Sequence, residues 1–245
     1  MSELFSIQLQ NRQQQGRDGV WLDLPTTTEQ VQAALRQIGI SSDNPQGLFI
    51  SGYFAEEEKR FAIPYNMVLA SNVDELNFLA SRLETLSTGE RAELNAALQA
   101  PQSELFSIGR ITDFPENVDY YVHLPDVTGT GQLGDYYLNR SGMVDMPEEW
   151  KGGIDTAQFG RYVAQQEQGA FTQYGYLVKS GDEWQKVHEG QPVPEEYRVL
   201  SFPAPEVLRD SANIPPPVQP ETEPQKVIPI ILNGKDSAER MKEIT

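Results

Sequence analysis

Regular apolar spacing stops at Phe202, and this limits where the chain can fold. Between residues 203 and 245 eight prolines interrupt the sequence, and no amphipathic face accumulates. Proline fixes φ and removes a backbone donor, so a stretch of this composition is typical of an extended linker. We therefore predict a folded region before residue 203 and a disordered tail over 203–245.

Residues 1–65 have the pattern of a small unit in which one helix packs on a sheet. Apolar and polar side chains alternate in short runs, as in half-buried strands. The predicted strands cover 4–10, 20–24 and 48–54. Thr26 and Glu29 have the spacing of a capping box, and Gly39 stands where the helix that they start should end.

Residues 66–100 predict a helical hairpin. Asn72 and Glu75 have capping-box spacing, and so do Ser87 and Glu90. Leucine and alanine recur at helical spacing after each pair. Two amphipathic helices are therefore expected to form a central helical unit.

Residues 101–202 predict a third, α+β unit. A strand over 120–124 is followed by a helix over 133–139, which should end near Gly142. A second helix should begin at Asp155, with Phe159, Tyr162 and Val163 on its inner face. The last expected element is a hairpin of strands over 174–179 and 184–188 around a turn at 180–182. Tyr136 and Tyr137 are also expected in the core by spacing. The fold class is therefore α+β.

Residues that serve common enzyme chemistry are scarce. The absence of cysteine excludes disulfides, thiolate metal sites and cysteine nucleophiles. The two histidines, His123 and His188, have no second ligand at metal-binding spacing, and residues 129–131 lack the remaining features of a phosphate loop. Glu148 and Glu149 lie in a polar turn, which disfavours a hydrolase built on them. We predict a protein that is not an enzyme and uses no cofactor or metal.

Charge indicates what kind of partner the chain binds. Asp and Glu number 36 against 19 Lys and Arg, for a formal net charge of −17. Such a chain repels nucleic acid and anionic membranes and favours basic partners. The N-terminal residues lack the pattern of a signal peptide, and no apolar run is long enough to cross a bilayer. We expect a cytoplasmic protein that binds neither DNA nor membrane directly.

The spacing of the acids is more informative than their number. Between residues 111 and 149 there are eight acids and one base, Arg140. B-DNA carries one charge per roughly 1.7 Å of its axis, so a protein surface that imitates it must scatter its carboxylates. Simple solvation is the other interpretation. The candidate acids are Asp113, Glu116, Asp119, Asp126, Asp135, Asp145, Glu148, Glu149 and Asp155.

Three segments resemble the ArdA antirestriction family. They are Gly19–Pro25 with the glycine-bearing loop before it, the Leu-rich helical stretch 74–98, and 135–163, which contains the signature Phe159-Gly160-Arg161. Their order and spacing agree with the family along about 200 residues. The C-terminal part of the tail, 226–245, is similar to the residues that precede a separate class of antirestriction domain, the ArdC-like class, which is found in large fusion proteins.

The resemblance implies an elongated three-part monomer that dimerises and occupies the DNA-binding groove of type I restriction-modification enzymes, without catalysis. It also implies a mobile-element origin. The family commonly has an acid where Tyr162 stands, and an acidic strand end where Gly52, Tyr53 and Phe54 stand. Phe159 and Tyr162, beside Gly160 and Arg161, are alternatively contacts with a dimer partner. The rival hypothesis is an acidic, non-catalytic interaction module at the N-terminus of a larger mobile-element protein.

Overall fold

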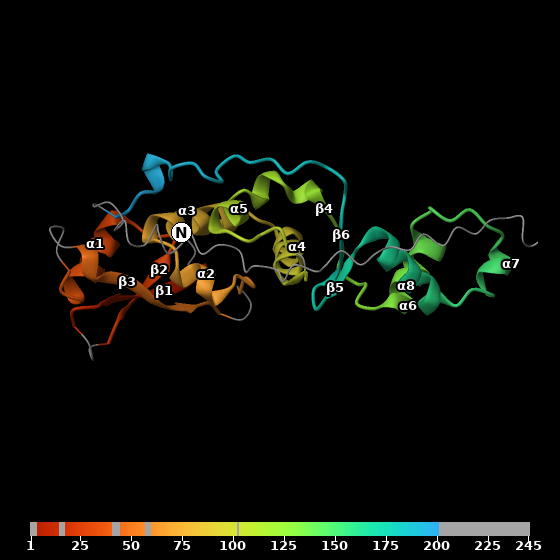
Figure 1. Ribbon diagram of the computed structural model, residues 1–245, viewed down its shortest axis with the longest axis horizontal. Coiled ribbons are helices and arrows are strands. Elements are labelled where there is room, and N and C mark those ends of the chain that lie inside the picture. The colour runs from red at the N-terminus through yellow and green to blue at the C-terminus, as the bar shows by residue number, and fades with distance from the viewer. Residues whose placement is uncertain (1–3, 15–17, 41–44, 57–59, 102, 201–245) are drawn as a thin grey trace, which may run out of the picture. The chain divides into compact units, whose positions relative to one another are not determined.

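The computed structural model describes residues 4–14, 18–40, 45–56, 60–101 and 103–200. Over these residues the chain forms two three-stranded antiparallel sheets and eight α-helices (Figure 1). The predicted α+β class is therefore confirmed. The predicted tail lies outside the described residues. None of the described helices is long and apolar enough to span a membrane.

The first sheet is formed by β1 (Phe5–Asn11), β2 (Val20–Leu24) and β3 (Leu48–Phe54), in the order β2-β1-β3. Helix α1 (Thr28–Gln37) packs on it. Alternation buries one face of each strand, and the side chains of Ile7, Leu9 and Leu24 are fully buried there. All four elements match the predicted ones.

The start of α1 differs from the prediction by one residue. The N-cap is Thr27, which forms a capping box with Gln30, in place of Thr26 and Glu29. Thr26 is buried, and its backbone N–H donates to Oδ1 of Asn77 at 2.7 Å. Because the backbone N–H of Thr26 already donates to Asn77, it is not available to the side chain of Glu29, and the capping box forms one position later.

The central helices begin as predicted. Their capping boxes are Asn72 with Glu75 for α3 (Val73–Glu84) and Ser87 with Glu90 for α4 (Thr88–Gln99). Further short helices surround them: α2 (Tyr65–Leu69), α5 (Ile108–Thr112), η3 (Phe114–Glu116) and η4 (Val118–Tyr120). These short helices were not predicted, because a run of three to five residues is too short to show a helical period.

The second sheet has the order β4-β6-β5, with β4 (Tyr121–Leu124), β5 (Ala170–Thr172) and β6 (Gly175–Lys179). The elements between β4 and β5 are α6 (Thr130–Asp135), the π-helical turn η5 (Tyr136–Arg140), α7 (Glu148–Lys151) and α8 (Thr156–Glu167). Asp155 caps α8 as predicted, and Gly142 follows η5 at φ +70°. Tyr136 and Tyr137 pack against a small core around Leu133 and Tyr176.

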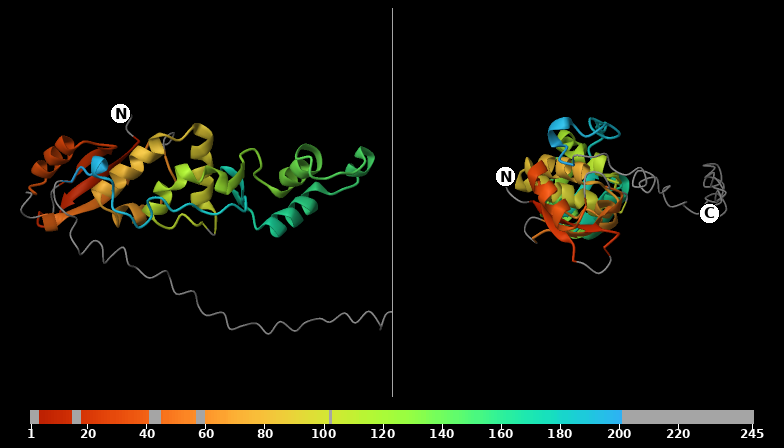
Figure 2. Two further views of the ribbon diagram at one scale, coloured as in Figure 1. Left: turned by 90° about the horizontal axis from the view of Figure 1, so that it is seen from above. Right: turned by 90° about the vertical axis from the view of Figure 1, so that its left-hand side faces the viewer.

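The chain then runs back along the helices from β6 as a return segment, residues 180–200, whose one helical turn is η6 (Glu195–Tyr197) (Figures 1 and 2). The prediction of a strand over 184–188 is wrong. Backbone N–H groups there donate to side chains, not to a neighbouring strand: Gln185 to Asn117 at 2.7 Å, and Val187, His188 and Glu189 to Asp113 at 3.2, 2.6 and 3.1 Å.

Two residues of α3 hold the far end of the return segment. One carboxylate oxygen of Asp74 accepts from the N–H groups of Val199 and Leu200, both at 2.7 Å. Asn77 is buried and donates to the carbonyl of Tyr197 at 3.0 Å, while its own carbonyl oxygen accepts from Thr26. Helix α3 therefore joins the return segment to the first sheet.

Removal of the Asp113 carboxylate should destabilise the fold. In Asp113→Ala three backbone N–H groups lose their acceptor, so we expect the free energy of unfolding to fall by about 3 kcal/mol or more. Urea unfolding followed by circular dichroism measures this change. The control, Asp126→Ala, alters an exposed acid and should stay within about 0.5 kcal/mol of the starting protein. Equal losses in the two variants would contradict the role given to Asp113.

Candidate partner-binding surface

The structure corrects one of the nine predicted acids. Asp113 is 0% exposed, and its oxygens are used by the backbone of the return segment, so it is not available to a partner. Glu116 is half-buried and forms an ion pair with Arg82 of α3. Both residues therefore contribute to packing within the chain.

The other seven acids lie at or near the surface. Four are exposed and have no hydrogen bond or ion pair to another described side chain: Asp119, Asp126, Asp145 and Glu149. Three are held by local contacts. Asp135 accepts from Asn139 at 2.8 Å and pairs with Arg140 at 3.0 Å, Glu148 pairs with Lys151 at 2.6 Å, and Asp155 accepts from the N–H groups of Ala157 and Gln158.

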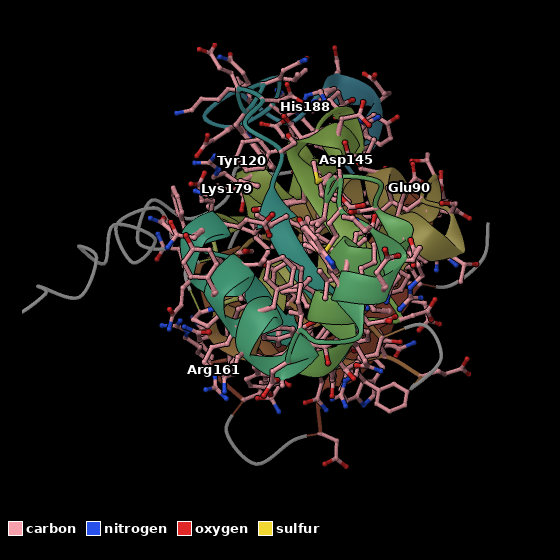
Figure 3. All side chains as sticks on the ribbon, turned by 90° about the vertical axis from the view of Figure 1, so that its right-hand side faces the viewer. Glu90, Tyr120, Asp145, Arg161, Lys179 and His188 are labelled. Atoms are coloured by element: carbon pink, nitrogen blue, oxygen red, sulfur yellow. The ribbon has the colours of Figure 1, made fainter. Side chains whose placement is uncertain are left out.

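These seven acids are dispersed over the chain's elements. They stand on η4, the turn after β4, α6, the loop before α7, α7 itself and the N-cap of α8. Asp145 lies on the side of the molecule that faces the viewer in Figure 3, well apart from Arg161. Hydrogen bonds from Asn139, followed by Arg140, lower the pKa of Asp135, which keeps that carboxylate ionised. The seven acids therefore stand on separate elements.

Sequence reasoning missed the exposed acids of the return segment. Asp182, Glu183, Glu195 and Glu196 are exposed, and the last two begin η6. Asp182 and Glu183 fall within the predicted hairpin, Glu195 and Glu196 follow it, and composition alone does not predict their exposure. They extend the acidic surface beyond the candidate stretch.

Asp113, Glu116 and His188 come within 4.8 Å of one another and have the residue types of a metal site. The Asp113 oxygens already accept three N–H groups, and the cation of Arg82 neutralises Glu116. The ring of His188 packs edge-on against Phe78, with 4.9 Å between the ring centroids. The cluster is therefore accounted for by packing.

The signature glycine sits where two helices cross. A Cβ atom on Gly160 of α8 would lie 1.9 Å from the carbonyl oxygen of Thr130, and one on Gly134 of α6 would lie 1.9 Å from that of Thr156. Only glycine permits such close contact of the two backbones. The signature is therefore at least partly a packing device.

This crossing also corrects the predicted inner face of α8. Gly160, Val163, Ala164 and Glu167 share one face of the helix and turn toward α6 and the second core. Tyr162 is 60% exposed, so it is not a core residue. Phe159 is half-buried. Arg161 is exposed and lines a cavity of about 480 Å³ with Tyr121 and Lys179.

Glu93 of α4 is the acid whose surroundings most disfavour its charge. Burial, and then the nearby charges of Glu90 and Asp119, raise its pKa to about 8. One of its oxygens is buried and lacks a hydrogen-bond partner among the described residues. Ionisation of Glu93 in the folded protein therefore costs free energy.

The described residues form an acidic α+β protein whose exposed carboxylates are scattered over several elements. A family model described as "Antirestriction protein (ArdA)" matches residues 15–178. The match covers more than half of the chain, and the protein belongs to the ArdA antirestriction family, whose members act on restriction-modification enzymes. No curated protein matches the chain. The match includes all nine candidate acids and the Phe159-Gly160-Arg161 signature, and it ends before the return segment.

Gly160→Ala should separate the packing role of the signature from its other roles. The added methyl meets backbone oxygen, so α6 and α8 must move apart, and we expect a loss of about 2 kcal/mol or more in unfolding free energy. Gly152→Ala is the control, because a Cβ there meets nothing within 4 Å and φ is −63°. Urea midpoints for the two variants test this, and an unchanged midpoint for Gly160→Ala would refute the close crossing.

Glu93 should make stability fall as pH rises. Its pKa is raised from 4.5 to about 8 on folding, so the folded state binds the proton more tightly, and stability is lost between those two values. Glu93→Gln removes this dependence. Because the side chain is partly exposed, we expect the variant to be more stable than the parent by about 1 kcal/mol at pH 8. Unfolding midpoints from pH 5 to 9 measure this, and parallel curves would contradict the assignment.

Proposed function

We propose that this antirestriction protein inhibits type I restriction-modification enzymes by mimicking DNA. Its exposed carboxylates would take the places of phosphates in the DNA-binding groove of the methyltransferase core. The observation that carries the proposal is the dispersal over separate elements of seven acids, none of which lines the cavity found among the described residues. The protein would act by occupancy alone and need no catalytic group.

The energetics require many acids to act together. Enzymes that bind DNA hold it mainly through Lys and Arg contacts to phosphate. An exposed ion pair contributes only about 0 to 1 kcal/mol, so one carboxylate adds little to affinity. A net charge of −17 also speeds the approach to a cationic groove. Single substitutions are therefore expected to have small effects.

The scaffold holds several of these carboxylates in place before binding. Asp155 is held by two backbone N–H groups, and Asp135 by Asn139 and Arg140. A side chain that is already ordered loses less entropy when it pairs with a partner. This favours acids that imitate a fixed row of phosphates over acids that only solvate the chain.

The proposal also includes a homodimer and a cellular location. By its family resemblance the protein would work as a homodimer in the cytoplasm of a cell that carries a mobile element. The exposed ring of Tyr162 would then suit a contact between protomers, because it is not needed in the core. Aromatic side chains are common in such contacts.

Reversal of three unpaired acids tests the proposal. We expect Asp126→Lys, Asp145→Lys and Glu149→Lys together to weaken inhibition of a purified type I methyltransferase by about a hundredfold, since attraction becomes repulsion at each site. Binding of the parent to the methyltransferase, measured without DNA, should also weaken as salt rises. Retention of full inhibition by the triple variant would refute DNA mimicry by these acids.

A second triple variant supplies the control. Asp18→Lys, Asp23→Lys and Glu29→Lys change the net charge equally but lie in the first unit, outside the proposed surface. We expect a much smaller loss from this variant. Equal losses from the two triples would show that net charge alone governs inhibition.

A further inference from the structure

Two large apolar side chains are exposed on the loop that carries α7. In this α7 loop, defined as residues 141–155, Met143 is 76% exposed and Trp150 is 66% exposed. Helix α7 has no buried residue, and within the described ranges no other helix or strand packs broadly against it. Most of the surface of both side chains is therefore left uncovered by the described residues.

The α7 loop is nevertheless held at both ends. The hydroxyl of Ser141 donates to the carbonyl of Tyr137 at 2.9 Å and accepts from the N–H of Met143 at 3.1 Å. At the other end Asp155 caps α8. A loop whose backbone is already held at both ends loses less backbone entropy when a partner covers it, so the loop is suited to binding.

The charges around these side chains indicate the partner. Four acids belong to the loop: Asp145, Glu148, Glu149 and Asp155. Lys151 is its one base, and this side chain is 15% exposed and paired with Glu148. The loop thus shows apolar groups bordered by negative charge. A complementary surface has an apolar recess bordered by Lys and Arg, and an Arg beside Trp150 would gain a cation–π contact as well.

We propose that Trp150 and Met143 are an apolar anchor that inserts into such a recess on the restriction-modification enzyme. The inference rests on the proposed function and divides the interface into two parts. Carboxylates supply affinity that salt weakens, and the anchor supplies affinity that salt leaves nearly unchanged. Tryptophan is the residue type most expected at the energetic centre of such a contact.

Truncation of the anchor across a range of salt concentrations tests the inference. We expect Trp150→Ala to weaken competition with DNA for a purified type I methyltransferase by about tenfold or more at every salt concentration, and Met143→Ala by a smaller factor. The slope of log affinity against log salt should not change, whereas Asp145→Lys with Glu149→Lys should reduce it. Trp21→Ala is the matched control, because Trp21 is 50% exposed in the first sheet, and it should bind within about twofold of the parent. Circular dichroism confirms that each variant is folded.

Three outcomes would overturn the inference. Parental binding by Trp150→Ala, while the acid reversals still weaken inhibition, removes the anchor and leaves DNA mimicry intact. Full inhibition by the acid-reversal triple removes DNA mimicry, and the anchor fails with it. A shift in the monomer–dimer equilibrium of Trp150→Ala in sedimentation, with unchanged binding of each protomer to the enzyme, assigns the loop to a second copy of the chain.

Discussion

The fold depends on buried side chains that satisfy a backbone without a neighbouring strand. The return segment passes over α5 and α3, and its N–H groups must find acceptors there. Asp113 and Asn117 supply them near the middle of the segment, and Asp74 supplies them at its end. The side chain of Asn77 on α3 accepts from Thr26, which follows β2, and donates to Tyr197 of the return segment. The chain after β6 is thereby joined to the helices that support the first sheet.

The same residue type therefore performs two opposite tasks in this protein. Asp113 is fully buried and stabilises the interior by accepting hydrogen bonds, whereas Asp126 and Asp145 are exposed and carry the charge that a partner meets. Glu93 lies between these cases, since its burial makes its charge costly. The three N–H groups that donate to Asp113 offset the cost of burying its carboxylate, whereas one oxygen of Glu93 has no such donor among the described residues.

Much of the fold can be predicted from local pattern. Capping residues such as Asn72 and Ser87 mark their helices because the bonds that they make span three residues. The return segment could not be predicted in this way, since Asp113 meets His188 from 75 positions away and nothing nearby indicates it. In the candidate site, the acidic character of 111–155 could be predicted, but exposure could not. Asp113 and Asp126 look alike in sequence. Helical spacing alone puts Tyr162 on the inner face of α8, but the close contact with α6 at Gly160 sets that face, and no local pattern predicts this contact.

The central claim is that this protein and DNA compete for one groove. Native mass spectrometry of a purified type I methyltransferase, mixed with the protein and a duplex containing its recognition site, measures this directly. The account predicts two binary complexes, with the protein displacing the duplex as its concentration rises. A stable ternary complex of enzyme, duplex and protein would contradict it.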